Sequence, residues 1–220
     1  MHQTQTDLMA FAARDAPLPP GAALAFTRVG GDPGFDLPEA IRRCAPRRQA
    51  TFASGRKAAR DALRKAGHRG DPIPGIAEDG LPDWPAGWLG SISHSDEIAA
   101  ALVAPIGGVR LLGLDVERIV TAEVALQIAP DVMPERPLGQ PPELEVTRAF
   151  SAKEALYKAL YPLTRQFREF SAAHVDWSGG GPDRVTLSLT EDWGADWPTG
   201  TTFDAAQRVA AGHVITILWR

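Results

Sequence analysis

Apolar and polar residues alternate most regularly in the run LLGLDVERI, residues 111–119. From residue 112 onward, leucine and valine occupy one set of alternating positions, and Asp115 and Glu117 fall in the other set. Such alternation predicts a strand whose two carboxylates leave the same face. Same-face neighbours on a strand lie about 7 Å apart, so two carboxylates in this arrangement can share one hard cation.

A helical pattern follows in the run FSAKEALYKAL, residues 150–160, where apolar residues recur every three or four positions. Its polar side carries Glu154 and Lys158, which stand four residues apart and can form an ordinary surface ion pair. Ser151 with Glu154 three residues later also matches a capping box, which would place the start of the helix at Ser151. Taken alone, Glu154 therefore has two structural explanations besides a catalytic or metal-binding one.

The same patterns predict the other elements of the chain. Strands are expected at residues 22–29, 90–95, 98–104, 173–177, 184–189 and 213–219, and helices at residues 46–66 and 121–128. The segment 90–119 is expected to form one small sheet in the middle of the chain, and the glycine-rich run 179–183 to join two strands. The five prolines between residues 130 and 142 predict an irregular surface loop. Helix followed by strands in each half permits a pseudo-duplicated arrangement.

Composition excludes several classes of protein. The 220 residues are 44 % hydrophobic, enough for a substantial core, and a net charge of −4 argues against a general nucleic-acid binder. The longest charge-free apolar stretch, residues 98–109, contains a proline and two glycines and is too short to span a bilayer. We therefore expect a soluble, unsecreted, cytoplasmic protein with no membrane span. Cys44, the single cysteine, excludes an internal disulfide and is expected to be a small buried hydrophobe.

A strongly basic block lies between Arg42 and Lys65, where nine basic residues accompany one acid. Its local charge of +8 favours an anionic partner, although a solvated helix face explains many of these residues equally well. Arg48 and Arg56 stand out because they project to broadly the same side of one helix, with Phe52 between them. Two guanidinium groups in that arrangement can hold a phosphate in bidentate fashion.

His94 lies between Ser93 and Ser95. A Ser-His nucleophilic pair lacks support, because the chain contains no GxSxG elbow. Zinc and nucleotide sites of the common kinds also lack their motifs, since HExxH and the Walker loop are missing from the sequence. His94 is thus either structural or, with its neighbouring hydroxyls, a donor of hydrogen bonds to a phosphate oxygen.

Four segments taken in order resemble the 4′-phosphopantetheinyl transferases of the Sfp and enterobactin synthase component D type. They are TFASGRKAARDAL (51–63), LPDWPAGWLGSISHS (81–95), LGLDVERI (112–119) and FSAKEALYKAL (150–160). The resemblance implies an α+β, pseudo-dimeric fold of two similar halves, each with a small mainly antiparallel sheet and packed helices. The halves are expected at residues 1–110 and 111–220.

The resemblance also implies an activity. Members of this family transfer the 4′-phosphopantetheine group of coenzyme A to a serine of an apo acyl-, aryl- or peptidyl-carrier protein and release adenosine 3′,5′-bisphosphate. The expected enzyme is thus a holo-[acyl-carrier-protein] synthase type transferase, dependent on Mg²⁺ with Mn²⁺ as a substitute. Its expected setting is siderophore, polyketide or nonribosomal peptide biosynthesis, but carriers of these pathways and of fatty-acid synthesis all present a similar serine, and the sequence does not select among them. A single chain that forms both halves points to a monomer.

Residue roles follow from the matched motifs. The implied metal ligands are Asp115, Glu117 and Glu154, and the implied catalytic residues are Glu154, Lys158 and His94. Glu154, or a metal-bound water beside it, is the candidate for taking the proton of the carrier serine. The implied contacts to coenzyme A are Arg48, Arg56, Ser93, His94, Asp115, Lys153 and Lys158. The first half is expected to bind the 3′-phosphate and adenosine, and the second half to carry the carboxylates.

Two other functions fit parts of this pattern. One is a non-catalytic coenzyme A or carrier-protein binding module, against which the intact acids, His94 and both lysines argue. The other is a metal-dependent phosphohydrolase using the same three carboxylates, for which no other motif speaks. Carrier docking is expected to rely on the apolar residues Val124, Leu126 and Met133.

Overall fold

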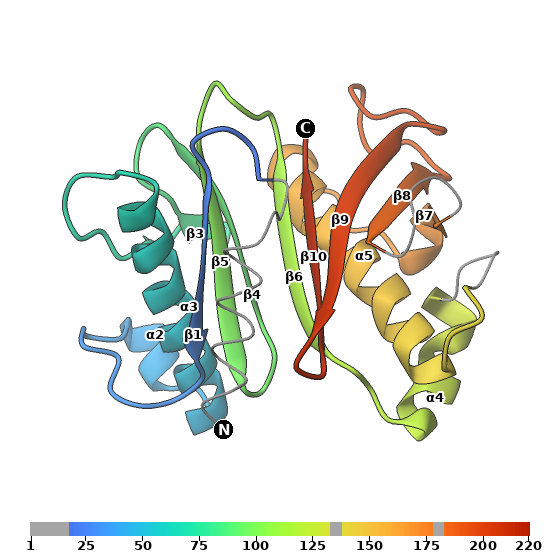
Figure 1. Cartoon of the computed structure of the whole chain (residues 1–220). Helices are drawn as coiled ribbons and strands as arrows, with labels where there is room; N and C mark the ends of the chain where they lie inside the picture. The colour runs from blue at the N-terminus through green and yellow to red at the C-terminus, as the bar shows by residue number, and fades with distance from the viewer. Residues whose placement is uncertain (1–17, 133–137, 178–182) are drawn as a thin grey trace. The chain divides into compact units, whose positions relative to one another are not determined.

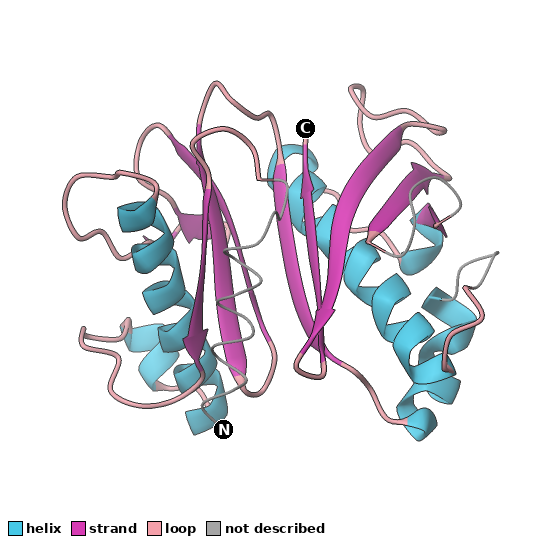
Figure 2. Cartoon of the chain, viewed as in Figure 1, coloured by secondary structure: helices cyan, strands magenta, loops and turns pink. Residues whose placement is uncertain are grey.

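A computed structural model describes residues 18–132, 138–177 and 183–220. The chain divides into two compact units, Met1–Val109 and Arg110–Arg220. Both units combine helices with antiparallel strands (Figure 2), so the expected α+β class is confirmed. Among the described residues, no helix has the length and apolar character needed to cross a membrane.

The first unit is built on a three-stranded antiparallel sheet of order β1-β5-β4, with the long helix α3 packed on it (Figure 1). Strand β5 lies at the centre, and its neighbours pair with it along their whole length. The elements are β1 (Ala23–Arg28), α2 (Glu39–Arg42), α3 (Pro46–Lys65), β2 (Gly75–Ile76), β3 (Pro82–Asp83), β4 (Trp88–His94) and β5 (Ile98–Pro105). The predicted strands and helix of this half are confirmed to within two residues.

Helix α3 has the ends and the buried stripe that its sequence predicts. Pro46 occupies the first turn, where its missing N–H costs nothing, and Gly67 follows the end with a φ of +91°. The buried residues at helical spacing include Ala58, Ala62 and Leu63, all of them without exposed surface. Small side chains on this stripe let the helix lie close to the sheet.

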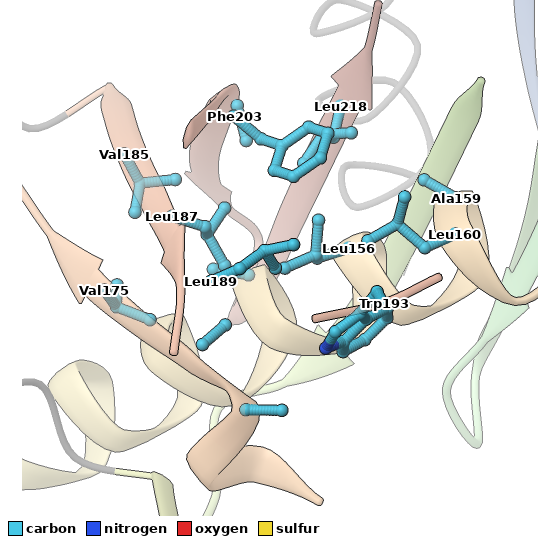
Figure 3. Packing of buried hydrophobic residues seen from close by; sticks show 14 of the residues in the cluster. Leu156, Ala159, Leu160, Val175, Val185, Leu187, Leu189, Trp193, Phe203 and Leu218 are labelled. Atoms are coloured by element: carbon cyan, nitrogen blue, oxygen red, sulfur yellow. The ribbon is translucent and has the colours of Figure 1, made fainter. Parts of the chain in front are cut away.

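The second unit contains a five-stranded antiparallel sheet of order β6-β10-β9-β8-β7, along which the long helix α5 runs (Figure 1). Its elements are β6 (Leu112–Arg118), α4 (Ala122–Val132), α5 (Pro142–Thr164), the 3₁₀ turn η1 (Phe170–Ala172), β7 (Ala173–Asp176), β8 (Arg184–Leu189), β9 (Thr202–Ala210) and β10 (His213–Trp219). Apolar side chains of α5 pack against those of the strands; Figure 3 shows Leu156 and Leu160 of the helix with Leu187 among them.

Several expectations about the elements were wrong. Strand β6 pairs with β10 and not with β5, so the middle of the chain contributes to two sheets. Strand β9 was missed altogether. Helix α4 continues through Pro130 to Val132, because Val132 packs with Ala125 into a cluster on α5, so this part of the predicted loop is helical. The remainder of that loop and the glycine-rich connection fall mostly outside the described residues.

Two smaller expectations also needed correction. Helix α5 begins at Pro142, so Ser151 lies in its interior and cannot cap it. The hydroxyl of Ser151 instead lies 2.8 Å from the hydroxyl of Thr216 on β10, with both residues fully buried. Cys44 is only partly buried, because it lies in the turn between α2 and α3, where its thiol bonds the carbonyl of Ala40 at 3.3 Å.

Candidate active site

Strand β6 carries the two carboxylates that the alternating pattern predicts. Asp115 has no exposed surface, and Glu117, two residues on, is partly buried. Their partners across the ladder on β10 are Thr216 and Val214. Because paired residues of antiparallel strands share a face, Asp115 lies beside the buried hydroxyl of Thr216 on the face toward α5.

Gly113 permits α5 to lie directly on this strand. A Cβ at position 113 would meet the carbonyl oxygen of Ala155 at 2.0 Å and the Cβ of Ala159 at 3.0 Å. Backbone therefore touches backbone at the point where strand and helix cross. The helix residues on either side of Ala155 are brought within reach of Asp115 by this close approach.

Lys158 is the residue that joins the two segments. Its Nζ donates to Oδ1 of Asp115 at 2.5 Å and lies 3.9 Å from Oε2 of Glu154. Burial lowers the pKa of Lys158, but the charge of Asp115, with further contributions from Glu154 and Glu117, outweighs that effect and raises the pKa above its usual value. The structure thus gathers the charges of all three predicted carboxylates around one ammonium group.

Glu154 faces this cluster from α5. Burial raises the pKa of its carboxyl, the charge of Lys158 acts in the opposite direction, and the negative charge of Asp115 raises the pKa further. The net result is a carboxylate that is more basic than an exposed glutamate. Its contact with Lys158 is also more than the simple surface pair expected from the sequence, because that lysine lies closer to the buried Asp115.

No ready metal centre is formed by these groups as they stand. In residues 18–132, 138–177 and 183–220, no three His, Cys, Asp or Glu side chains make a group that holds a metal ion. The donors nevertheless suit a hard cation, since all three are carboxylates. If all four side chains are ionised, the three carboxylates and the ammonium of Lys158 have a net charge of −2. One divalent cation would balance that charge.

Lys153 faces a different direction from its neighbour Glu154. Its Nζ donates to the carbonyl oxygen of Phe170 at 2.8 Å, and burial lowers its pKa to about 8. The reason is helical geometry, because successive residues are turned by about 100° around a helix axis. The structure therefore places Lys153 between α5 and η1 and gives no direct contact between it and Asp115.

A cavity of about 90 Å³, open to solvent on one side, adjoins Glu154 and Lys153. Four aromatic residues line it, Tyr157, Phe167, Phe170 and Trp193, together with the charged residues Arg168 and Glu169. The ring of Tyr157 meets both Phe167 and Trp193 edge to face, at centroid distances of 6.0 and 6.4 Å. A ligand in this cavity would therefore meet aromatic rings as well as charged residues.

The first unit carries the predicted pair of arginines on α3. Arg56 is buried: its Nη2 donates to the carbonyl of Gly75 at 2.9 Å, and its guanidinium lies 4.5 Å from the ring centre of Phe52. Burial, with a smaller contribution from the charge of Arg48, lowers the pKa of Arg56 to about 10. Arg48 is exposed on the same side of the helix, so the two cations are near enough to repel each other.

Ser93 and His94 end strand β4 of the same unit. As consecutive strand residues they point to opposite faces, and Ser93 is 5 % exposed whereas His94 is exposed. Ser93, His94, Arg48 and Arg56 therefore belong to the first unit, and Asp115, Glu117, Lys153, Glu154 and Lys158 to the second. The structure brings Asp115, Glu154 and Lys158 into one cluster.

Three residues of this site were not singled out from the sequence. Gly113 had a signal, because an isolated glycine inside a strand pattern indicates close approach of another backbone. Thr216 and Trp193 had none, since a buried threonine and a loop tryptophan depend on tertiary packing alone. All three determine the space around Asp115 and Glu154 or the adjoining cavity.

Comparison with known proteins gives matches to both units. A family model described as the 4′-phosphopantetheinyl transferase N-terminal domain matches residues 37–104, and one described as the 4′-phosphopantetheinyl transferase superfamily matches residues 111–217. The chain is 32 % identical over 192 residues to 4′-phosphopantetheinyl transferase Npt of Nocardia iowensis, covering 81 % of this chain and 85 % of that protein.

Two further proteins are also similar to this chain in sequence. The identity to 4′-phosphopantetheinyl transferase PptT of Mycobacterium tuberculosis is 32 % over 212 residues, which is 89 % of this chain and 91 % of that one. The identity to enterobactin synthase component D of Salmonella typhi is 38 % over 125 residues, or 54 % of this chain. The match spans about half, 51 %, of that relative's length.

Proposed function

The chain belongs to the 4′-phosphopantetheinyl transferase superfamily, of the Sfp and enterobactin synthase component D type, and from this premise we propose that it modifies carrier proteins. The proposed reaction moves the 4′-phosphopantetheine group of coenzyme A to a serine of an apo carrier protein, as a holo-[acyl-carrier-protein] synthase does. The observation that carries the proposal is the cluster in which Lys158 lies against Asp115 and Glu154. A cytoplasmic location and a monomeric state belong to the same proposal.

In this reaction the serine hydroxyl of the carrier attacks the phosphorus that bears the pantetheine. A new P–O bond forms, the bond to the leaving phosphate breaks, and adenosine 3′,5′-bisphosphate departs with the electron pair. We assign the serine proton to Glu154, or to a metal-bound water beside it, because the raised pKa of Glu154 makes it a better base than an exposed glutamate. Lys158 keeps a positive charge beside the developing negative charge of the pyrophosphate.

The proposal assigns Asp115, Glu117 and Glu154 as the residues that would hold Mg²⁺, with Mn²⁺ as a substitute. When bound, the cation would neutralise charge on the pyrophosphate of coenzyme A. The cluster has a net negative charge, because it contains three carboxylates and only one ammonium group, that of Lys158. A divalent cation would balance this charge. Asp115 would then share its charge between Lys158 and the cation.

We place the two ends of coenzyme A on different groups of side chains. Arg48 and Arg56 are assigned to its 3′-phosphate, with Ser93 and His94 as further phosphate contacts, because guanidinium groups and hydroxyls bind phosphate oxygens well. The pantetheine chain is assigned to the cavity beside Glu154, whose aromatic walls suit its methylene and dimethyl groups. Lys153, in the lining of that cavity, is assigned to the phosphate end of the chain.

The test is the mass of an apo carrier protein incubated with this protein, coenzyme A and Mg²⁺. A phosphopantetheine adduct that disappears with EDTA and returns with added Mg²⁺ is expected. An unmodified carrier, tried across acyl, aryl and peptidyl types, would leave the proposal without support. Loss of coenzyme A without a carrier present would favour the phosphohydrolase, and binding without any chemistry would favour the non-catalytic module.

A further inference from the structure

Three polar side chains form a row across the sheet of the second unit. Gln207 on β9 is paired in register with Thr216 on β10, and Thr216 is paired with Asp115 on β6. Because paired residues of antiparallel strands share a face and their Cβ atoms lie about 4.5–5.5 Å apart, these side chains are neighbours on the face toward α5. None of the three has exposed surface. This polar row, Gln207–Thr216–Asp115, therefore depends on partners from the helix.

Helix α5 supplies a partner for each residue of the polar row. At one end, Nε of Arg148 donates to Oε1 of Gln207 at 2.6 Å, and the amide of Gln207 donates back to the carbonyl of Arg148 at 2.9 Å. In the middle, the hydroxyls of Ser151 and Thr216 lie 2.8 Å apart. At the other end is the ion pair of the candidate active site. Every residue of the row is thus bonded to the same helix.

The helix residues that bond the polar row lie along one face of α5. They are Arg148, Ser151 and Lys158, separated by three and by seven positions, and residues at such spacings share a helix face. Ala155, whose carbonyl lies against Gly113, is between them. A helix rises about 1.5 Å per residue, so Ser151 lies only about 10 Å along the axis from Lys158. A contact that fixes Ser151 therefore also fixes the part of the helix that carries the active-site charges.

The crossing of helix and strand explains why hydrogen bonds are needed there. Gly113 and Ala155 meet at the crossing without large side chains, so their contact limits how closely the helix approaches but opposes its sliding and rotation only weakly. Hydrogen bonds, in contrast, are directional. Thr216 is bonded from two sides, since Nε2 of Gln207 also donates to its hydroxyl oxygen at 2.9 Å. The hydroxyl of Thr216 is thus held in place and can hold Ser151 in one register.

We propose that Thr216 is a positioning residue, whose hydroxyl keeps α5 in the register that sets Glu154 and Lys158 against Asp115. The inference rests on the proposed function, because the placement of those charges matters for the rate only if they take part in the reaction. Without the hydroxyl, helix and sheet would still pack through apolar side chains, but α5 would be free to shift. A shift of about 1 Å can lower the rate of a reaction between positioned groups by about 100-fold.

The test compares Thr216→Val, which keeps the shape of the side chain and removes the hydroxyl, with Thr216→Ser, which keeps the hydroxyl. The maximal rate of carrier modification should fall roughly tenfold or more in Thr216→Val. It should stay within about threefold of the unaltered chain in Thr216→Ser, which retains the hydrogen bonds. Rates are compared at equal folded fraction, measured by circular dichroism.

Val185→Ala is the matched control for a loss of stability alone. Val185 is a buried residue of the same sheet, on β8, and lies outside the polar row (Figure 3). Its truncation removes apolar packing, so we expect unfolding at a lower urea concentration than for the unaltered chain. The rate per folded molecule should stay within about twofold of the unaltered chain, because no hydrogen bond to α5 is lost.

Double variants separate positioning from a purely structural role. In the Asp115→Asn background, Thr216→Val should lower the rate by no more than about twofold, because the charge toward which the helix is positioned is gone. A purely structural residue would lower the rate by the same factor in both backgrounds. Urea unfolding gives a second readout that needs no activity: the midpoint shift of Thr216→Val combined with Lys158→Met should be smaller than the sum of the two single shifts.

Should Thr216→Val not fold, Ser151→Ala removes the same contact from the helix side, and alanine favours the helix. The same loss of rate is expected. Unchanged rates in Thr216→Val and Ser151→Ala would overturn the proposal, and so would equal losses in both backgrounds or strictly additive urea shifts. If the unaltered chain modified no type of carrier, the proposed function would fail, whereas the urea comparison would still test how Thr216 holds α5.

Discussion

The carbonyl oxygen of Ala155 lies only 2.0 Å from the place where a Cβ on Gly113 would stand. Position 113 thus admits only glycine unless helix α5 moves away from strand β6. Two residues beyond Gly113 on that strand is Asp115, and three residues beyond Ala155 on the helix is Lys158, which bonds it at 2.5 Å. The close crossing of helix and strand is what brings these two charges together.

Gly113→Ala is therefore expected to disturb stability and activity together. Overpacking of this kind costs about 1–3 kcal/mol or more of unfolding free energy, and displacement of α5 moves Lys158 and Glu154 away from Asp115. Chemical denaturation and the carrier-modification assay measure the two effects. Gly108→Ala serves as the control, because its Cβ would meet nothing closer than 3.6 Å. If Gly113→Ala and Gly108→Ala had the same stability and activity, the crossing of helix and strand would tolerate a side chain at position 113.

The contact between Asp115 and Lys158 predicts energetic coupling. Asp115 is fully buried and Lys158 is 26 % exposed, so loss of either partner leaves the other partly uncompensated. We expect Asp115→Asn and Lys158→Met each to lower the free energy of unfolding by about 1–3 kcal/mol, less than for a fully buried pair because solvent screens Lys158. The double variant should lose less than the sum by at least about 0.5 kcal/mol. Strict additivity in denaturant titrations would contradict the coupling.

Binding of Mg²⁺ should compete with Lys158 for the carboxylates. Without coenzyme A, the ammonium already bonds Asp115, and a second cation there is repelled. Titration calorimetry should therefore show weak binding to the chain alone and tighter binding when the pyrophosphate of coenzyme A is present. Lys158→Met should bind Mg²⁺ at least roughly tenfold more tightly than the unaltered chain without coenzyme A. The same affinity in both proteins would mean that the cation binds elsewhere.

If Arg48 contacts the 3′-phosphate, its loss should affect binding of coenzyme A and of 3′-dephospho-coenzyme A differently. Arg48→Met should weaken binding of coenzyme A by roughly tenfold or more, the effect of losing a charge-assisted hydrogen bond. Binding of 3′-dephospho-coenzyme A should stay as it is, because that molecule lacks the phosphate in question. Arg64→Met is the control: Arg64 is a basic residue of the same helix, 3.7 Å from Asp71. If Arg48→Met lost equal affinity for coenzyme A and for 3′-dephospho-coenzyme A, Arg48 would not be a contact of the 3′-phosphate.

The elements that could be predicted from the sequence are those with a local pattern. Helix α3 and strands β1, β4, β5, β8 and β10 show either apolar periodicity or a largely apolar run, and the structure has them within two residues of the expected bounds. Strand β9 was missed because its inward positions include Gln207, a polar residue with no exposed surface. Its burial is made possible by hydrogen bonds to Arg148 and Thr216, which no local pattern reveals.

The start of α5 was hidden for the same reason. Residues 142–149 include Glu145 and Arg148, charged residues that the structure buries to 4 % and 2 % exposure, so the apolar stripe looks interrupted in the sequence. Of the candidate site, the chemical identity of Asp115, Glu154 and Lys158 could be recognised from motifs. Their contact could not, because Lys158 lies 43 residues from Asp115 and meets it only through the crossing at Gly113.

We propose that the cluster around Asp115 catalyses transfer of phosphopantetheine to a carrier serine. The most direct measurement is the rate of carrier modification, followed by intact mass, for the unaltered chain, Asp115→Asn and Glu145→Gln. Glu145 is also a buried carboxylate of the second unit, but it accepts a hydrogen bond from the backbone of Gln140, which glutamine also allows. We predict a loss of about 100-fold or more for Asp115→Asn. For Glu145→Gln, whose replacement keeps the acceptor, we predict a rate within about threefold of the unaltered chain. Similar rates for all three proteins would contradict a catalytic role for the cluster around Asp115.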